Sequence, residues 1–353
     1  MNIFQSIRKR LEGKYSRIIR GLLSIQADCS ARYGPDYRLV RLIGEELNYL
    51  RWRRWLGNDA LKFLGIRKPH LPYGLPGIAA QIDGYDLEKD VRIEENGVRV
   101  GDILLPKPHE GADTATFEIE MNDFVLPYFL RRRLKDFDEK HERLYDLLES
   151  LYCVEGPYEL GNDVALCPGD VVVDCGANMG LFSAIAAQNG CRVFAFEPIP
   201  IVIDNYLSVT AANYPTVTIC RYALWDEKKE LLFKVSPQNI GSSTAIAEKS
   251  LERHIDVRVE ATTLDDFVER NNVENIDFIK ADIEGAERNM LRGAKNVLKR
   301  FAPKLAICKY HLPDDPQVIR DIILDANSAY RIVEKYTKLF AYVPKPDGGE
   351  RSA

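Results

Sequence analysis

The sequence predicts an α/β protein whose larger part is a Rossmann-like, mostly parallel sheet with helices on both faces. From about residue 152, short and almost continuously apolar segments alternate with helical segments, as in parallel strands joined by crossover helices. A glycine-containing turn joins the first of these strands to the first helix. Two final strand-like segments predict an antiparallel hairpin that closes the sheet. An N-terminal α+β extension is expected to precede this part.

The elements of the sheet follow from local apolar patterns. Strands are expected where apolar residues run together, at residues 171–174, 192–197, 217–221, 276–281 and 304–309. Helices are expected where apolar residues recur with a helical period, at residues 181–189, 201–212, 284–300 and 316–327. The closing hairpin should pair residues 330–334 with residues 339–343.

The remaining sequence suggests three further regions. The Pro- and Gly-rich stretch from Pro69 to Gly77 is the clearest break, and Asn96-Gly97 between two alternating segments predicts a hairpin. A strand near residues 117–121 and a long helix at 123–151 should follow. We therefore expect a basic helical extension (1–75), a small α+β region (76–151), a main domain (152–345) and a tail (346–353).

Charge is distributed unevenly along the chain. Residues 1–70 contain 15 Lys and Arg against 6 Asp and Glu, although the whole chain has a net charge of −5. Residues 1–25 place apolar side chains at helical spacing among basic ones, which suits either an anionic membrane surface or packing on a helix or second subunit. We favour packing. This local basic segment does not indicate nucleic-acid binding.

Composition indicates a globular protein of two or three units, with 353 residues, 46% hydrophobic and 29% charged. We find no apolar run long enough to span a membrane and no secretory signal, and we expect a cytoplasmic location. The seven cysteines include Cys175, Cys220 and Cys308 in apolar segments, which favours buried thiols over disulfides. Scattered histidines and the absence of C-x-x-C give no support to a zinc site.

The turn after the first strand indicates a nucleotide site. Glycines let the backbone approach a ligand, and the N–H groups at the start of the following helix point at it. The dinucleotide fingerprint G-x-G-x-x-G is absent, because Asp174 and Cys175 occupy its first positions. S-adenosylmethionine (SAM), whose charged amino-acid end needs a carboxylate, therefore fits better than NAD, although an ordinary βα turn remains the simpler alternative. The expected cofactor contacts are Asp174, Gly176, Ala177, Asn178 and Gly180.

Residues at the ends of the next two strands extend this site. Glu197 ends the second strand, 21 residues beyond Gly176, where an acid can accept hydrogen bonds from both ribose hydroxyls. Pro198 follows it, and the backbone near Ala223 lies where adenine is expected. A single strand-end acid is usually only solvated, but its coupling to the glycine turn favours the ribose role.

The later strand ends carry candidate catalytic residues. Asp282 and Glu284 follow the fourth strand, where they can bind substrate, act as a base or hold a divalent cation; Asp282 is the metal ligand if there is one. Helix capping is the alternative, and Glu287 suits it best. His311 follows the fifth strand and is our candidate general base, although a single histidine is more often structural. Tyr310, Ser242 and Ser243 are candidate substrate contacts.

The order of these motifs resembles the FkbM family of SAM-dependent methyltransferases over residues 152–345. The resemblance rests on Glu-Gly-Pro-Tyr-Glu at 155–159, Asp-Cys-Gly-Ala-Asn-Met-Gly at 174–180, Phe-Glu-Pro at 196–198, Gly-Ser-Ser at 241–243, Thr-Leu-Asp at 263–265, Lys-Ala-Asp-Ile-Glu-Gly-Ala-Glu at 280–287 and Ile-Cys-Lys-Tyr-His at 307–311. It implies the class I methyltransferase fold, SAM as donor and, most often, O-methylation of a sugar or natural-product hydroxyl. Lys309 departs from the family, which often has an apolar residue there.

We therefore expect a SAM-dependent O-methyltransferase that acts on a glycan or small-molecule hydroxyl, with His311 as base and Asp282 orienting it, binding the acceptor or holding a metal. A nicotinamide-dependent oxidoreductase is the first alternative, but it predicts no terminal hairpin. A non-catalytic SAM-binding scaffold is the second, and it predicts SAM binding without turnover.

Overall fold

The computed structural model describes residues 27, 30, 31, 91–94, 97–106, 157–235, 254–335 and 337–344. The expected basic N-terminal helix, the strand near 117–121, the helix at 123–151 and the tail lie outside the described residues. The chain divides into two compact units, and apart from residues 27, 30 and 31 the described residues belong to the unit of residues 90–129 and 154–353. The predicted domain boundaries stay predictions.

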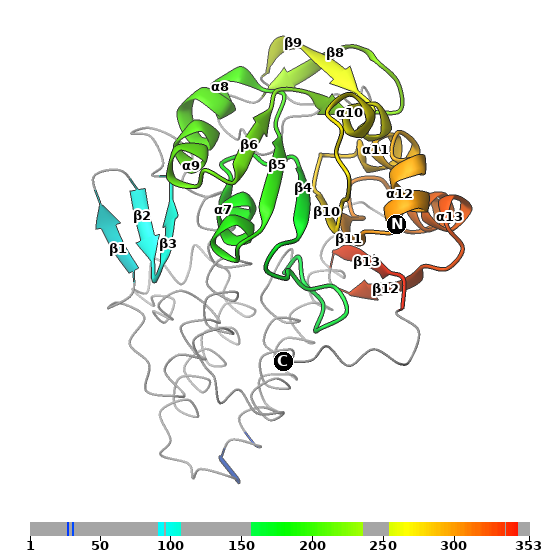
Figure 1. Cartoon of the computed structure of the whole chain (residues 1–353), viewed down its shortest axis with the longest axis horizontal. Helices are drawn as coiled ribbons and strands as arrows, with labels where there is room; N and C mark the ends of the chain where they lie inside the picture. Colours follow the sequence, from blue (N-terminus) through cyan, green and yellow to red (C-terminus); the bar gives the residue numbers. More distant parts are fainter. Residues whose placement is uncertain are drawn as a thin grey trace, which may run out of the picture. The chain divides into compact units, whose positions relative to one another are not determined.

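Seven of the described strands form the central sheet (Figure 1). Its strands are β4 (Val171–Cys175), β5 (Arg192–Phe196), β6 (Val217–Cys220), β10 (Phe278–Ala281), β11 (Lys304–Cys308), β12 (Arg331–Lys335) and β13 (Lys338–Tyr342). Their order is β12-β13-β11-β10-β4-β5-β6. The pairs among β11, β10, β4, β5 and β6 are parallel, whereas β13 is antiparallel to both of its neighbours. The predicted strands and the closing hairpin are therefore confirmed.

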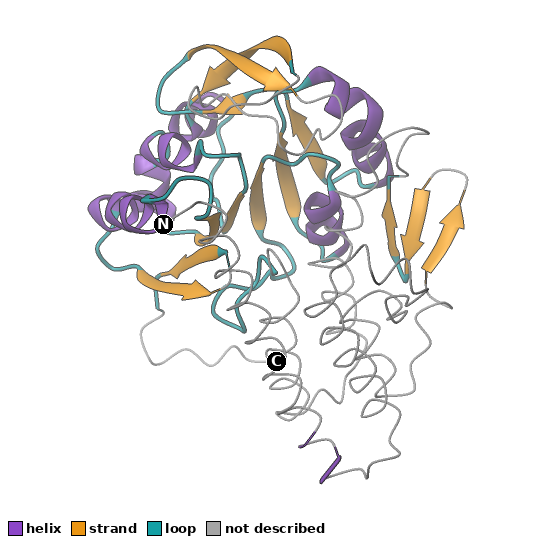
Figure 2. Ribbon diagram, turned by 180° about the vertical axis from the view of Figure 1, so that it is seen from behind, coloured by secondary structure: helices purple, strands orange, loops and turns teal. Residues whose placement is uncertain are grey.

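Helices cover both faces of the sheet (Figures 1 and 2). One face carries α7 (Leu181–Gln188) and α9 (Ser208–Asn213). The other carries α10 (Leu264–Arg270), α11 (Glu287–Arg292), α12 (Lys295–Phe301) and α13 (Asp315–Ala326). Alternate strand residues such as Val173, Phe194, Ile279 and Leu305 enter the main hydrophobic core on this second face. Because both faces are buried, the strands are apolar almost throughout, as the sequence pattern indicates.

Two predicted helices are interrupted in the structure. The segment expected at 201–212 is built from α8 (Pro200–Val202), the π-helical segment η3 (Ile203–Leu207) and α9. The segment expected at 284–300 begins later, at Glu287, and divides at Gly293 into α11 and α12. A Cβ atom at Gly293 would lie 2.0 Å from the carbonyl oxygen of Trp225, so this glycine allows a close approach of two backbones.

A second sheet was not predicted. Its strands are β7 (Ala223–Leu224), β8 (Lys229–Val235) and β9 (Ile255–Thr262), in the order β7-β9-β8. β8 and β9 are antiparallel, and Val257, Val259 and Ala261 alternate with polar residues along β9. This alternation of apolar and polar residues is typical of a strand and could have predicted β9. The long connection between β6 and β10 contains this sheet and α10 rather than a simple crossover.

The predicted hairpin near residues 91–100 is confirmed, but Gly97 lies in a strand and not in the turn. β1 (Val91–Glu94) and β2 (Gly97–Val100) are antiparallel, and β3 (Ile103–Leu105) pairs with β2. Gly97 pairs with Glu94 inside the ladder. A Cβ atom there would lie 2.2 Å from the carbonyl oxygen of Leu105, so the close neighbour β3 requires the glycine. The Leu104 N–H donates to the Tyr214 hydroxyl at 2.8 Å, which links β3 to the end of α9.

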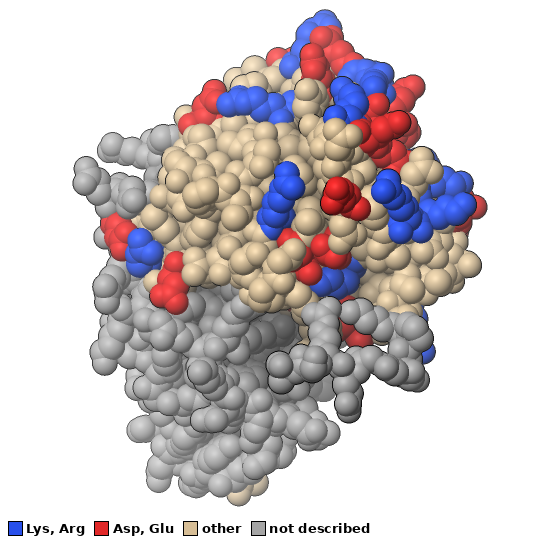
Figure 3. Space-filling model, in the orientation of Figure 1, with Lys and Arg blue, Asp and Glu red and all other residues tan. Residues whose placement is uncertain are grey.

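Acidic and basic side chains of the described residues intermingle on the face shown in Figure 3. Exposed ion pairs among the described residues include Lys295–Asp325 and Arg221–Asp204. Cys167, Cys175, Cys191, Cys220 and Cys308 are free thiols. Among the described residues, no helix combines the length and the apolar character that a membrane span requires.

Candidate active site

The glycine turn after β4 is fitted closely to its surroundings. Gly176 has φ 74°, and a Cβ atom on it would lie 2.1 Å from the carbonyl oxygen of Asp282. The N–H groups of Gly176 and Ala177 both donate to the carbonyl of Phe196 at 3.0 Å. Gly180 has φ 83°, and its Cβ would lie 2.8 Å from Thr210 Oγ1. Both glycines are therefore required by a left-handed backbone and by close packing against β10 and α9.

Asp174 forms a buried ion pair beneath this turn. Its carboxylate accepts a hydrogen bond from Ser183 Oγ at 2.6 Å and lies 3.0 Å from Lys280 Nζ. Lys280 also donates to the carbonyl of Gly176 at 2.7 Å. Burial alone would lower the pKa of Lys280, but the charge of Asp174 raises it well above its usual value. Asp174 thus stabilises the turn from within, and its contact with a bound cofactor stays a prediction.

Glu197 follows β5 on the other side of the turn. One of its oxygens accepts from the N–H of Asn178 at 3.1 Å and the other accepts from the N–H of Ile199 at 3.0 Å. Burial raises the pKa of Glu197 to about 7, and the backbone hydrogen bonds oppose this shift only in part. These contacts fix the carboxylate at the strand end, where the ribose role was predicted.

The start of α7 lies between these two acids in the sequence. Gly180 occupies the N-cap position in a left-handed conformation, and no side chain caps the helix. The first turn of a helix presents N–H groups that need partners, so its N-terminus suits a polar ligand group. The binding of a cofactor by this end of α7 and Glu197 stays a prediction.

A second group of side chains surrounds the turn that follows β10. The Glu287 side chain is fully buried, and its two oxygens accept from the N–H groups of Ile283 and Gly285 at 2.9 and 3.0 Å. These bonds do not cap α11 (Glu287–Arg292), which has no side-chain cap; Glu287 instead binds N–H groups of the preceding turn, so the predicted capping role is wrong. Glu284 lies within this turn with φ 56°, a left-handed conformation that is uncommon outside glycine. Glu287 therefore holds the turn that presents Glu284.

His311 lies at the centre of three carboxylates. Its Nδ1 is 3.0 Å from Glu287 Oε1. Its Nε2 is 3.6 Å from Asp282 Oδ1 and 3.6 Å from Glu284 Oε2. The His311 side chain is 2% exposed, whereas those of Asp282 and Glu284 are 18% and 19% exposed. The structure thus brings the three predicted catalytic residues together, with the imidazole beneath the two acids.

The charges of neighbouring residues shift the pKa values of His311 and Asp282. Burial lowers the pKa of His311, but the neighbouring carboxylates, Glu287 first among them, raise it more, so its pKa lies above the usual imidazole value. Burial likewise raises the pKa of Asp282, but the charge of Lys280 and other neighbours lowers it below the usual value. An ionised Asp282 is therefore favoured at neutral pH.

Tyr158, Lys280 and Lys338 are neighbours of the cluster that the sequence did not assign to the site. The Tyr158 hydroxyl donates to Asp282 Oδ2 at 2.8 Å. The ammonium groups of Lys338 and Lys280 lie 4.2 and 5.3 Å from the centre of the Tyr158 ring. Tyr158 and Lys280 could have been predicted as site residues, because both belong to the motifs that resemble the FkbM family.

The remaining predicted site residues have different surroundings. The Tyr310 ring packs on His311 with centroids 4.1 Å apart and is 44% exposed, which leaves it accessible to a substrate. Ala223 begins β7 and is buried, and Pro198 is half-buried beside Glu197. Lys309 forms an ion pair with Glu334 of β12. Ser242 and Ser243 lie outside the described residues.

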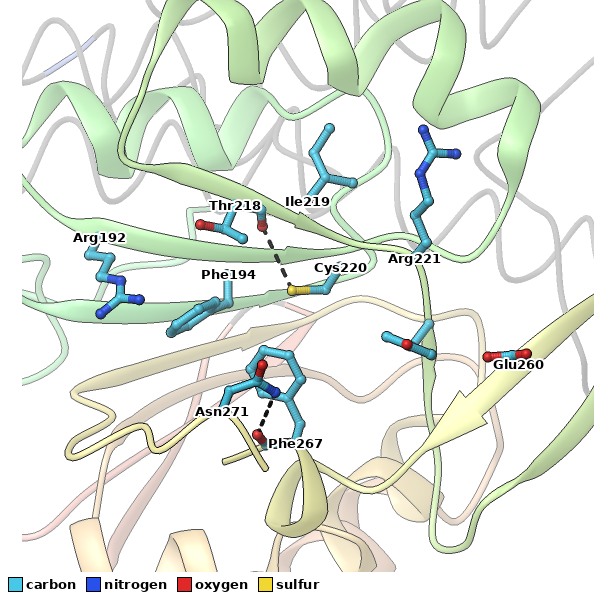
Figure 4. A pocket seen from close by; sticks show the side chains of 10 residues that line it. Arg192, Phe194, Thr218, Ile219, Cys220, Arg221, Glu260, Phe267 and Asn271 are labelled. Atoms are coloured by element: carbon cyan, nitrogen blue, oxygen red, sulfur yellow. Dashed lines mark hydrogen bonds between the residues drawn. The ribbon is translucent and has the colours of Figure 1, made fainter. Parts of the chain in front are cut away.

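A separate groove of about 580 Å³ lies along β5 and β6 (Figure 4). Arg192 and Phe194 of β5 face Phe267 of α10 and Asn271, which follows that helix, and Arg221 and Glu260 lie at one end. None of the predicted site residues lines this groove. It is therefore a feature distinct from the glycine turn and the histidine cluster.

The strand order, the antiparallel β13 and the glycine turn define the class I fold of SAM-dependent methyltransferases. Residues 174–332 match the sequence profile of the Methyltransferase FkbM domain, so this part of the chain is similar to that family. The terminal hairpin also argues against the oxidoreductase alternative, which predicts none.

Curated relatives include three named methyltransferases. The hexuronic acid methyltransferase AglP of Haloferax volcanii is 26% identical over 165 residues, which cover 47% of this chain and 66% of that protein. Methyltransferase 1 of Beauveria bassiana is 30% identical, with coverage of 37% and 61%. The 31-O-demethyl-FK506 methyltransferase FkbM of Streptomyces tacrolimicus is 27% identical, with coverage of 39% and 64%. The chain thus spans slightly less than two thirds of the length of these relatives.

Solved structures include a methyltransferase FkbM from Methylobacillus flagellatus KT. It is 22% identical, with a TM-score of 0.41, and the match covers 65% of this chain and 60% of that one.

Proposed function

We propose that the protein transfers the methyl group of SAM to a hydroxyl group of a sugar or a natural product. The proposal rests on the direct contact between two groups of residues. The glycine turn packs against the backbone of Asp282, and Asp282 is the first residue of the cluster formed with Glu284, Glu287 and His311. A donor on the turn and an acceptor over the cluster would therefore be neighbours. Two relatives, a hexuronic acid methyltransferase and a 31-O-demethyl-FK506 methyltransferase, support this acceptor class by their names.

The donor side is assigned to the turn and to Glu197. SAM supplies an electrophilic methyl group on a sulfonium. The carboxylate of Glu197 would accept hydrogen bonds from the ribose hydroxyls, and the N–H groups at the start of α7 would meet polar groups of the cofactor. The left-handed Gly176 and Gly180 keep side chains out of this approach.

The acceptor side is assigned to Asp282, Glu284 and His311. Methyl transfer is an in-line displacement, so an enzyme mainly aligns the reactants and helps to remove the hydroxyl proton. Asp282 and Glu284 have exposed surface and can accept a hydrogen bond from the hydroxyl, while His311 lies beneath them. Tyr310, exposed next to His311, offers a ring face on which a sugar can pack.

Methyl transfer itself is the direct test. Isotopically labelled SAM is incubated with the protein and extracted glycans or hydroxylated natural products, and the products are identified by mass analysis. Label in an O-methyl group supports the proposal, and separate titrations with SAM and NAD should show binding of SAM alone. SAM binding with no transfer to any acceptor would instead favour the scaffold alternative.

A further inference from the structure

The Nε2 atom of His311 is a buried nitrogen that faces two carboxylates without a hydrogen bond. Asp282 Oδ1 and Glu284 Oε2 both lie 3.6 Å away, beyond hydrogen-bond distance, and the imidazole side chain is 2% exposed. Among the described residues, neither imidazole nitrogen makes a hydrogen bond of good geometry, but Nδ1 lies 3.0 Å from Glu287 Oε1 whereas Nε2 has no carboxylate oxygen so close. A buried polar atom in this state indicates a missing partner.

We propose that His311 Nε2, Asp282 Oδ1 and Glu284 Oε2 bind a divalent transition-metal ion. Each carboxylate oxygen lies 3.6 Å from His311 Nε2, and two donor atoms at that separation can both lie about 2.1 Å from one ion, a usual metal–nitrogen and metal–oxygen distance. The ligands come from two loops, after β10 and after β11, so the ion would join neighbouring strand ends.

The other nitrogen of the imidazole has the surroundings that a metal ligand needs. Histidine ligands usually donate their second N–H to a carboxylate, which fixes the ring and its tautomer. His311 Nδ1 lies 3.0 Å from Glu287 Oε1, and Glu287 is itself held by two backbone N–H groups. Glu287 therefore supports the ligand rather than binding the ion. The donor atoms of Asp282, Glu287 and His311 all lie within 4.8 Å of one another, which places the supporting carboxylate beside two of the three proposed ligands.

The ligand types favour one class of ion. An imidazole nitrogen suits Fe²⁺ or Zn²⁺ better than Mg²⁺ or Ca²⁺, which prefer oxygen ligands, and the two carboxylates also suit Mn²⁺. Two carboxylates match a divalent charge, and their exposed surface leaves room for further ligands from the solvent or the acceptor. Such an ion acts as a Lewis acid toward a hydroxyl. Its use in turnover rests on the proposed methyl transfer, whereas the binding of the ion does not.

Binding is tested with Mn²⁺ on the full chain after treatment with EDTA. Electron paramagnetic resonance counts the free Mn²⁺ during titration, and we expect saturation at about one ion per chain. His311→Ala and Glu284→Gln should weaken binding at least tenfold, and Glu287→Gln should weaken it by about tenfold, as supporting carboxylates do. His254→Ala, at a histidine that directly precedes β9, is the matched control and should bind as the wild type does.

Several outcomes would overturn the proposal. It is wrong if the wild type shows no saturable Mn²⁺ binding, or if His311→Ala binds as tightly as His254→Ala. SAM affinity, measured by calorimetry on the same EDTA-treated samples, checks that each variant is folded and tests the donor site separately. Methyl transfer that is unaffected by EDTA, together with lost activity in His311→Ala, would assign His311 as the general base instead of a metal ligand.

Discussion

The ammonium group of Lys280 lies 3.0 Å from the carboxylate of Asp174, and the two residues are direct partners in the parallel pairing of β10 with β4. Both side chains are almost completely buried. Because Lys280 also donates to the carbonyl of Gly176, this pair ties the glycine turn to the strand that ends at Asp282. The two halves of the proposed active site therefore share one buried interaction.

Replacing Lys280 by Met should destabilise the protein strongly. Removing one partner of a buried ion pair leaves the other charge uncompensated and costs about 3–5 kcal/mol in the free energy of unfolding. Urea denaturation measures this change. Lys295→Met, which breaks the exposed pair with Asp325, is the control and should leave stability almost unchanged. The double variant Lys280→Met, Asp174→Asn should lose less than the sum of the single variants; strict additivity would contradict the coupling.

SAM affinity should decrease as the pH falls through about 7. The pKa of Glu197 is raised to about 7 by burial, and only the ionised carboxylate offers acceptors to both ribose hydroxyls. The folded protein binds this proton more readily than the unfolded chain, so ionisation of Glu197 lowers stability as the pH rises from about 4.5 to 7. Calorimetry between pH 6 and 8 should show the affinity change in the wild type.

Glu197→Gln separates this effect from other titrating groups. Its SAM affinity should be about tenfold or more below that of the wild type at pH 8, because a hydrogen bond to a charged group contributes about 1.5–3 kcal/mol. The variant should also show no change of affinity near pH 7. An equal pH dependence in wild type and variant would assign the titration to another residue.

His311→Ala should bind SAM normally and lose methyl transfer by about a hundredfold or more, whether His311 acts as a base or as a metal ligand. The imidazole contacts the acceptor-side carboxylates and lies outside the turn assigned to the donor. The measurements are calorimetry with SAM and transfer of labelled methyl groups. Normal turnover in this variant would remove His311 from the mechanism, and His254→Ala controls for the loss of an imidazole elsewhere.

The positions of strands and of the nucleotide turn could be predicted because they depend on local pattern. Val171–Val173 and Phe278–Ile279 are apolar since both faces of the sheet are buried, and the turn needs its glycines at fixed positions. Local pattern also showed that Asp282 and His311 follow strands of one sheet. We could therefore expect Asp282 and His311 to lie close together, because parallel strands end at the same edge of a sheet.

The buried polar contacts could not be predicted from the same patterns. Lys280 would ordinarily be assigned to a solvated position, and its burial depends on the register that places it opposite Asp174. Glu287 was interpreted as a helix cap, whereas it holds the turn before α11, and its contact with His311 depends on the packing of α11 against the loop after β11. Tyr158 reaches Asp282 across 124 positions of sequence, a distance that no local pattern covers.

Gly176→Ala should abolish SAM binding and destabilise the fold. The added Cβ atom would lie 2.1 Å from the carbonyl oxygen of Asp282, a backbone atom that can move only with β10. The left-handed backbone adds its own strain of about 1–3 kcal/mol. Gly161→Ala is the matched control, because Gly161 also has a positive φ but no atom within 4 Å of its Cβ position. It should show the strain alone and retain SAM affinity. Equal losses of affinity in both variants, measured by calorimetry, would show that backbone strain and not the contact with Asp282 requires the glycine.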